Sequence, residues 1–365
     1  MKKLLALLLA LVMVLSFAAC SNNEEPVEDN SSEETSSEEQ SNEETEEPVA
    51  ETYKLGMGIV VSTASSKEAQ AQVDATVAVV VTDSEGKIVK CELDVAQTKL
   101  AVEGGLVPED LSTVDVRSKQ EKGYDYNMVK FGGAIAEWFE QADAFAAAVV
   151  GMTGADVEAL ETIVNEGGHN VAVDETIYAS CTMDITAFKA AIVKACNDEY
   201  AKEFTAENWT LGLGVNTDVS ESTSATADAN GVAKLYTNFA AAVVAEDGTI
   251  LADLLDVIQP KVEFDTTGAI VTVSADYDAS FRTKKELKED YNMVTYGGAV
   301  AEWYEQATTF ENYVVGMNAN EVAGIETVVN EGGHNVVTDE TISASCTMGV
   351  SEFMSTLAKA FANAR

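Results

Sequence analysis

Basic residues, histidines and prolines are scarce in this sequence, and the scarcity excludes several classes of function. Among 365 residues there are 62 Asp and Glu but only 22 Lys and Arg, so the formal net charge at pH 7 is −40. This charge repels phosphate backbones, and we expect neither nucleic-acid binding nor docking of the protein surface on anionic lipids. The apolar share of 46% is sufficient for ordinary cores, and the length suggests about two domains.

Metal sites and disulfide frameworks are also disfavoured. The five cysteines include no CxxC pair, and histidine occurs only at positions 169 and 334. Zinc sites of the Cys/His type and multi-cysteine iron–sulfur sites need more closely spaced ligands than this. Neither the twelve-residue calcium loop nor the G-x-S-x-G elbow of hydrolases occurs.

The first 20 residues have the features of an export signal. Lys2 and Lys3 precede an apolar run that is short for a membrane-spanning helix and ends just before Cys20. The small residues before this cysteine resemble the lipobox of bacterial lipoproteins, in which the signal is removed and the new N-terminal cysteine is lipidated. We therefore expect residues 1–20 to be a lipoprotein signal peptide, with Cys20 anchoring the protein to the outer face of the cell membrane. The alternative is an ordinary secretory signal followed by an incidental cysteine.

Residues 21–51 are predicted to form a disordered acidic linker. They contain 13 acidic residues and no Lys or Arg. Such a composition cannot bury enough apolar surface to fold, and its like charges keep the chain extended. The segment would be a spacer between the body of the protein and the lipid surface, or simply a solvated leader.

The remaining sequence contains one unit twice. The recurring segments are KLGMG at 54–58 and TLGLG at 210–214, DYNMV at 125–129 and 290–294, GGAIAEWFEQA at 132–142 and GGAVAEWYEQA at 297–307, NEGGHN at 165–170 and 330–335, and DETIYASCTM at 174–183 and DETISASCTM at 339–348. Each unit has the length of a whole domain rather than that of a solenoid module. We expect two tandem homologous domains, repeat 1 at 52–205 and repeat 2 at 206–365.

The patterns within each unit predict an α+β fold, in which a small antiparallel sheet packs with helices. The expected elements are hairpin strands at 73–81 and 87–93 and at 241–245 and 249–254, a long amphipathic helix over 135–149, a shorter helix over 155–163, and final helices over 185–200 and 350–364. Asp184 and Ser351 are candidate N-caps of the final helices.

The aromatic residues and histidines allow two interpretations each. Trp138 and Trp303 lie on the apolar face of the long helix, where core packing is the better interpretation. Tyr126 and Tyr291 precede that helix in a polar loop, and they either stack on a planar ligand or close the core. The two histidines lie in Gly-Gly-His-Asn loops and either take part in ligand or proton handling or form local hydrogen bonds.

The segment before each final helix combines small and hydroxyl-bearing side chains. It reads Ala-Ser-Cys-Thr at 179–182 and again at 344–347. A helix N-terminus offers free N–H groups and the positive end of the dipole, which favour a phosphate. A threonine hydroxyl there could donate to a phosphate or carry one covalently. The alternative is a capping turn with ordinary Ser/Thr hydrogen bonds.

This arrangement resembles the FMN-binding domain family found in secreted and membrane-anchored bacterial electron-transfer proteins. In that family a dGkI-type hairpin opens the domain, and a D-x-x-[ST]-G-A-T segment leads into a final helix. This chain has DSEGKI at 83–88 and the two ASCT segments before its final helices. Over most of both repeats, the expected elements follow one another in the same order as in this family. The resemblance implies that FMN is attached through its phosphate to the motif threonine by a separate flavin transferase.

Two alignments to the family motif give different attachment residues. Counting from the helix gives Thr182 and Thr347, whereas counting from Asp174 and Asp339 gives Ser180 and Ser345. We prefer the threonines, because the spacing to the helix decides where a phosphate meets the helix dipole.

The resemblance therefore implies an extracytoplasmic lipoprotein that binds FMN in both repeats and relays electrons to a membrane or extracellular redox partner. Tyr126 and Tyr291 complete the candidate cofactor site, together with Cys181 and Cys346, which we interpret as small packing residues rather than redox thiols. Since the flavin would carry the chemistry, an electron carrier is expected rather than an enzyme. The alternative is a non-redox surface lipoprotein that binds a small ligand or a cell-wall partner.

Overall fold

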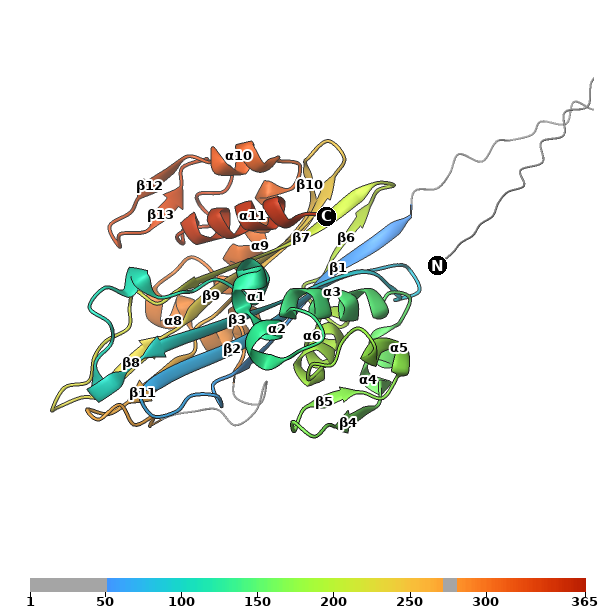
Figure 1. Cartoon of the computed structure of the whole chain (residues 1–365). Helices are drawn as coiled ribbons and strands as arrows, with labels where there is room; N and C mark the ends of the chain where they lie inside the picture. Colours follow the sequence, from blue (N-terminus) through green and yellow to red (C-terminus); the bar gives the residue numbers. More distant parts are fainter. Residues whose placement is uncertain (1–50, 272–280) are drawn as a thin grey trace, which may run out of the picture. The chain divides into compact units, whose positions relative to one another are not determined.

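Each repeat contributes an antiparallel sheet that contains its predicted hairpin (Figure 1). In repeat 1 the strand order is β3-β2-β1-β6, with β1 at Thr52–Ser62, β2 at Gln70–Thr82, β3 at Ile88–Ala101 and β6 at Lys202–Thr205. In repeat 2 the order is β10-β9-β7, with β7 at Trp209–Asp218, β9 at Tyr236–Ala245 and β10 at Ile250–Ile258. The antiparallel pairing of β2 with β3 and of β9 with β10 confirms both hairpins.

The computed structural model describes residues 51–271 and 281–365. The predicted signal peptide, Cys20 and all of the acidic linker except Glu51 therefore lie outside the described residues. Within the described ranges, no helix is long and apolar enough to cross a membrane.

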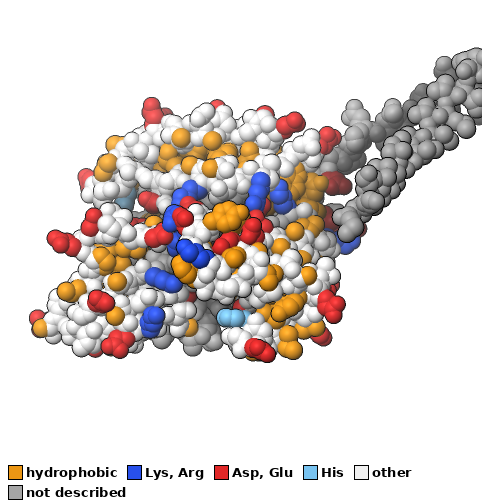
Figure 2. All heavy atoms as spheres, viewed as in Figure 1, with side chains coloured by type: hydrophobic (Ala, Val, Ile, Leu, Met, Phe, Trp, Pro, Cys, Tyr) orange, Lys and Arg blue, Asp and Glu red, His pale blue; other side chains and the backbone are white. Residues whose placement is uncertain are grey.

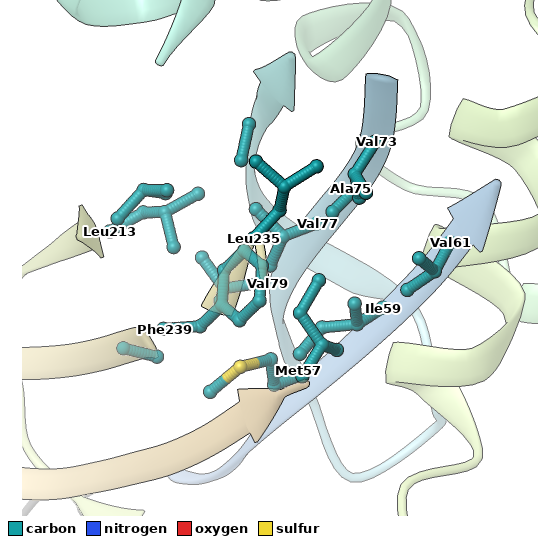
Figure 3. Close-up of a cluster of buried hydrophobic side chains, with 14 of the residues drawn as sticks. Met57, Ile59, Val61, Val73, Ala75, Val77, Val79, Leu213, Leu235 and Phe239 are labelled. Atoms are coloured by element: carbon teal, nitrogen blue, oxygen red, sulfur yellow. The ribbon is translucent and has the colours of Figure 1, made fainter. Parts of the chain in front are cut away.

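The two sheets share one core (Figure 3). Met57 and Ile59 of β1 belong to it together with Leu213 of β7 and Phe239 of β9. The sheets also approach at their edges, since β3 lies beside β7 and β6 lies beside β10. The mixed architecture of helices and small antiparallel sheets agrees with the expected α+β class. Two separate tandem domains are not confirmed, because the described residues of both repeats belong to one compact unit.

Helices cover the outer face of each sheet and enclose a further core in each repeat. They are α3 (Trp138–Ala148), α4 (Gly154–Ala159) and α6 (Thr186–Cys196) in repeat 1, and α9 (Trp303–Val314), α10 (Ala319–Ala323) and α11 (Ser351–Asn363) in repeat 2. The strands are buried on both faces for this reason. Val60 of β1, for example, packs under the helices while its neighbour Ile59 faces the shared core.

Short elements complete each repeat. They are α1 (Lys119–Lys122), α2 (Met128–Gly132), β4 (Thr162–Val164), β5 (Asn170–Ala172) and α5 (Glu175–Tyr178) in repeat 1, and β8 (Gly231–Lys234), β11 (Lys261–Phe264), α7 (Lys284–Leu287), α8 (Met293–Gly297), β12 (Thr327–Val329) and β13 (Asn335–Val337) in repeat 2. Single 3-10 turns lie at Glu103–Gly105, Leu111–Thr113, Gly123–Tyr126 and Lys288–Tyr291.

The recurring Leu-Gly-x-Gly segment allows each final helix to lie directly on the first strand of its sheet. A Cβ atom at Gly56 would collide with the carbonyl oxygen of Ala195, and one at Gly58 would collide with that of Ala191. The glycines of β7 face α11 in the same way. This close approach places α6 and α11, and it thereby positions the hydroxyl-bearing segment that precedes each of them.

Several helix boundaries differ from the expected ones. The long helix begins at Trp138 rather than at residue 135, because Glu137 forms a capping box with Glu140 and leaves Ile135 exposed ahead of it. The helix expected over 155–163 ends at Ala159, and the following Thr-Ile-Val forms β4, as β-branched residues favour.

The expected N-caps of the final helices are wrong in detail. Ile185 occupies the N-cap position of α6, although the Asp184 carboxylate accepts the N–H of Thr186 at 2.9 Å. Val350 occupies the N-cap position of α11, so Ser351 is its first helical residue.

Candidate functional site

Two of the predicted site residues, Thr182 and Tyr126, line one cavity in repeat 1. The cavity has a volume of about 530 Å³, which lies within the range of small-molecule pockets. Strands β2 and β3, the short helices α1 and α2, the first turn of α3 and the segment before α6 supply its wall. Further lining residues include Asp74, Lys119, Trp138, His169 and Asp184.

The Thr182 side chain is held at the cavity wall by a buried glutamine. Its backbone N–H donates to Gln141 Oε1 at 2.9 Å, and its hydroxyl lies 3.2 Å from the same oxygen. Gln141 is fully buried on α3, and its Nε2 donates to the carbonyl of Ala136 at 2.8 Å. This second bond determines the orientation of the amide, so the threonine faces an oxygen acceptor.

An ammonium group faces the aromatic part of the cavity. Lys119 Nζ lies 5.1 Å from the ring centroid of Tyr126 and 5.2 Å from that of Trp138. Burial lowers the pKa of Lys119 to about 8, against the opposing effect of Asp74 and Asp94. On the face of the molecule shown in Figure 2, Lys and Arg side chains gather near the middle, over α1. The cavity therefore offers a cation beside two aromatic rings, which suits an anionic or electron-rich planar ligand.

Tyr126 is half-buried, and its hydroxyl group is also held. Its OH lies 3.3 Å from Gln97 Oε1, and Gln97 Nε2 donates to Asp74 Oδ1 at 2.8 Å. Trp138 is buried in the core of repeat 1, as expected, and it reaches the cavity wall as well. His169, in the turn between β4 and β5, adds to the wall.

Repeat 2 builds the same constellation from the equivalent residues. The backbone N–H of Thr347 donates to Gln306 Oε1 at 2.8 Å, and its hydroxyl lies 3.3 Å from that oxygen. Lys284 Nζ lies 4.9 Å from the ring of Tyr291 and 5.3 Å from that of Trp303. Burial lowers the pKa of Lys284 to about 8, as it does for Lys119.

Ser180 and Asp174, which the alternative alignment selects, are not among the residues that line the repeat 1 cavity. Ser180 and Ser345 are exposed, and their hydroxyls donate to the carbonyls of Ile177 and Ile342. Asp174 caps the short helix α5 by accepting two backbone N–H groups. Its counterpart Asp339 accepts from Thr341 and from the Tyr313 hydroxyl, and this lowers its pKa.

Cys181 and Cys346 are fully buried beside the candidate threonines. Burial raises the pKa of both thiols, that of Cys346 to about 11. A thiol in this state is a poor nucleophile at neutral pH, which agrees with a packing role.

The helix N-terminus is arranged differently from the expected phosphate site. Helix α6 begins only at Thr186, and the Asp184 carboxylate accepts the N–H groups of Thr186 and Asn170 at 2.9 and 2.8 Å. A carboxylate thus stands where the phosphate was expected. The equivalent residue in repeat 2 is Gly349, so no carboxylate side chain occupies that position there.

The residues of the cavity fit FMN in most respects. The volume admits a planar heterocycle, the aromatic rings and Met128 supply apolar contacts, Lys119 supplies a cation, and Thr182 supplies a hydroxyl. The carboxylates of Asp74 and Asp184 are the exceptions, since they oppose a second negative charge nearby.

Sequence reasoning missed the two residues that organise the site. Gln141 lies in a segment that recurs in both repeats, but its neighbours suggest only an amphipathic helix. Lys119 follows Ser118 in a capping box with Glu121. The same S/T-K-x-E pattern begins at Thr283 in repeat 2 and was the available signal for this turn.

Comparisons with known proteins add no assignment: no protein-family model, no curated protein and no solved structure matches this chain. Across residues 51–271 and 281–365, no group of three or more His, Cys, Asp and Glu side chains could hold a metal ion.

Proposed function

We propose that this protein binds FMN in both repeats and relays electrons on the outer face of a membrane, held there by a lipid on Cys20. The observation that carries the proposal is the meeting of Thr182, Lys119, Tyr126 and Trp138 in one cavity. The same set recurs in repeat 2 around Thr347. In both repeats a lysine that forms no ion pair with any residue the structure describes faces two aromatic rings, which favours a ligand-binding role over a purely structural one.

When bound, the flavin supplies the capacity to accept and donate electrons, and the chain supplies position and electrostatics. The half-buried Tyr126 and the buried Trp138 line the wall that a planar heterocycle would contact. Lys119 offers a positive charge, and the Gln141 amide oxygen accepts from the threonine and orients its hydroxyl.

Covalent attachment would make Thr182 Oγ1 and Thr347 Oγ1 the acceptors. An Oγ1–P bond would form while the P–O bond to the leaving group of a flavin phosphoanhydride breaks. The hydroxyl proton would leave with solvent or the leaving group, and a flavin transferase would supply catalysis. Before attachment, each threonine hydroxyl would donate a hydrogen bond to the nearby amide oxygen, Gln141 Oε1 in repeat 1 and Gln306 Oε1 in repeat 2.

The test is expression of the full chain with a bacterial flavin transferase in an exporting host. Intact mass and flavin fluorescence on a denaturing gel should show two flavin additions per chain. Thr182→Ala and Thr347→Ala should each remove one addition, and the double variant should remove both.

Matched controls are Ser180→Ala and Ser345→Ala, which change the neighbouring exposed hydroxyls. They should leave both additions in place. Loss of flavin in the serine variants alone would move attachment to the serines. A colourless wild-type protein without any addition would favour the non-redox ligand-binding alternative instead.

A further inference from the structure

The lysine of the repeat 1 site lies in a short turn that a capping box holds. Lys119 is the first residue of α1 and follows the N-cap residue Ser118. Glu121 Oε2 accepts the backbone N–H of Ser118 at 2.8 Å, and Ser118 Oγ accepts that of Glu121 at 3.2 Å. Because Lys119 lies between the two residues of this box, the position of Glu121 helps to determine where the lysine side chain starts.

The second oxygen of this glutamate is bound by the other repeat. Glu121 Oε1 lies 2.7 Å from Nζ of Lys359, which belongs to the final helix α11 of repeat 2. Figure 1 shows α11 and α1 side by side. The same Nζ donates to the backbone carbonyl of Val215 in β7 at 2.7 Å. The ammonium thus joins the turn of repeat 1 to the sheet of repeat 2.

Repeat 2 has the same arrangement with the roles of the repeats exchanged. Thr283 and Glu286 form the capping box around Lys284. Glu286 Oε1 lies 2.6 Å from Nζ of Lys194, on the final helix α6 of repeat 1. That Nζ donates to the backbone carbonyl of Ile59 in β1 at 2.7 Å. Each repeat therefore receives one lysine from the final helix of the other.

A carboxylate of the same repeat provides a further anchor for each turn. Asp94 Oδ1 accepts the N–H of Gln120 at 3.0 Å, and Asp256 Oδ1 accepts that of Lys285 at 3.2 Å. These aspartates lie on β3 and β10, in the sheet of their own repeat. They hold the backbone of the turn, whereas the lysine from the other repeat holds the glutamate side chain.

The two ion pairs between the repeats act locally rather than on global stability. Their four side chains are between 27% and 35% exposed, and ion pairs that stay in contact with water contribute little to stability. Each ammonium has two oxygen partners, and each glutamate uses both of its oxygens. The consequence of losing a pair should therefore be a change in the turn that carries the site lysine.

We infer that each candidate site is completed by the other repeat: Lys194 is a positioning residue for the site of repeat 2, and Lys359 is one for the site of repeat 1. Each acts on the opposite site lysine through the glutamate of its capping box. The consequence for flavin rests on the proposed function, whereas the consequence for the site lysines does not.

The test measures the reactivity of the two site lysines in the full chain, expressed without a flavin transferase. Acetylation over a series of pH values, followed by peptide mass spectrometry, gives a separate titration for Lys119 and for Lys284. Both should titrate near pH 8, because burial lowers the pKa of each to about 8. In Lys194→Met, Glu286 loses the ammonium that holds it, so Lys284 should gain contact with water. Its pKa should rise toward the ordinary value near 10.4, while that of Lys119 stays in place.

Lys359→Met should have the reciprocal effect and move the titration of Lys119 alone. Lys194→Arg should restore the wild-type titrations, because the guanidinium keeps the charge and can reach the same carboxylate. Lys189→Met is the matched control on α6, since Lys189 Nζ donates to the carbonyl of Leu160 within its own repeat. This control should leave the site lysine of repeat 2 unchanged.

Glu286→Gln tests the same link from the other side. It keeps Lys194 and an amide oxygen that can accept the N–H of Thr283, but it removes the ion pair. Lys284 should respond as it does to Lys194→Met. This variant decides the question if Lys194→Met fails to fold.

A shift in the site lysine of the mutated lysine's own repeat, in both site lysines or in neither would overturn the inference. With a flavin transferase present, Lys194→Met should lower the flavin on Thr347 relative to that on Thr182, and Lys359→Met should do the reverse. If the lysine titrations respond as expected but the wild-type chain carries no flavin, the proposed function fails while the positioning of the lysines stands.

Discussion

A single buried amide connects the long helix of each repeat to its candidate threonine. Gln141 is fully buried and serves the backbone N–H of Thr182, the hydroxyl of Thr182 and the carbonyl of Ala136. A buried N–H that loses its only acceptor lowers stability by about 1–3 kcal/mol. The glutamine therefore contributes to both stability and the presentation of the hydroxyl.

We expect Gln141→Leu to lower the free energy of unfolding by about 2 kcal/mol and to reduce flavin attachment in repeat 1. The shape of the side chain is roughly kept, but the Thr182 N–H loses its acceptor. Urea denaturation measures the first effect, and intact mass after co-expression with the transferase measures the second. Gln306→Leu is the matched variant: it should lower the free energy of unfolding by a similar amount and reduce flavin attachment in repeat 2 alone. An unchanged unfolding curve for both variants would contradict this assignment.

Buried carboxyl groups near the short helices make stability depend on pH. Burial raises the pKa of Asp256 to about 7 and that of Asp94 to about 6. A carboxyl whose folded pKa is raised binds its proton more tightly in the folded state. Between the unfolded pKa near 4 and the folded pKa, rising pH therefore lowers the free energy of unfolding.

Asp256→Asn should remove part of this pH dependence. The variant keeps an oxygen acceptor for the N–H groups of Val257 and Lys285 but cannot ionise. Relative to the wild type, it should gain a few kcal/mol as the pH rises from 4 to 7. Asp94→Asn should behave alike over the narrower interval from 4 to 6. Urea denaturation at several pH values measures the gain, and a constant difference at all pH values would contradict the prediction.

At the scale of elements, the contact between the final helix and the first strand determines where each site lies. Gly212 and Gly214 face the backbone of α11, where added Cβ atoms would overlap the carbonyl oxygens of Ala360 and Thr356. Backbone atoms cannot move aside as flexible side chains do. The helix would have to shift as a whole, together with the segment that carries Thr347.

We expect Gly212→Ala to destabilise the protein by about 1–3 kcal/mol, the range for overpacking of a well-packed core. Chemical denaturation measures the loss. Gly86→Ala is a useful comparison, because no atom lies near its added Cβ and only its positive φ of 77° opposes the side chain. If Gly212→Ala were as stable as the wild type, the close packing of α11 on β7 would be wrong.

The elements that could be predicted from sequence are those with strong local signals. Valine-rich alternation and the Asp-Gly or Glu-Gly turns predicted both hairpins correctly, and helical periodicity predicted the long helices. The start of α3 was missed because Glu137 caps it, while Ile135 continues the apolar period but stays exposed. The sequence predicted that Thr182 and Tyr126 belong to one cofactor site, but it did not predict which elements would bring them together. The approach of Lys119 depends on a single helical turn, whose position is set by tertiary contacts and not by periodicity.

At the scale of the molecule, the two repeats depend on each other through matched contacts. Lys194 of α6 pairs with Glu286 of α7 at 2.6 Å, and Lys359 of α11 pairs with Glu121 of α1 at 2.7 Å. Both glutamates belong to the capping boxes of the helices that carry the site lysines. The final helix of each repeat thus helps to position the site lysine of the other.

Separation of the repeats should therefore prevent either from folding alone. The inner faces of both sheets would lose their shared core, and the fully buried Glu311 of repeat 2 would lose Lys202 of repeat 1, whose Nζ lies 3.3 Å away. We expect fragments 51–205 and 206–365 to bind a hydrophobic dye and to lack cooperative unfolding when expressed separately. Mixing and refolding them together should restore cooperative unfolding, because the contacts that join them are specific. Cooperative unfolding of fragment 51–205 by itself would contradict this dependence and would make repeat 1 an independent domain.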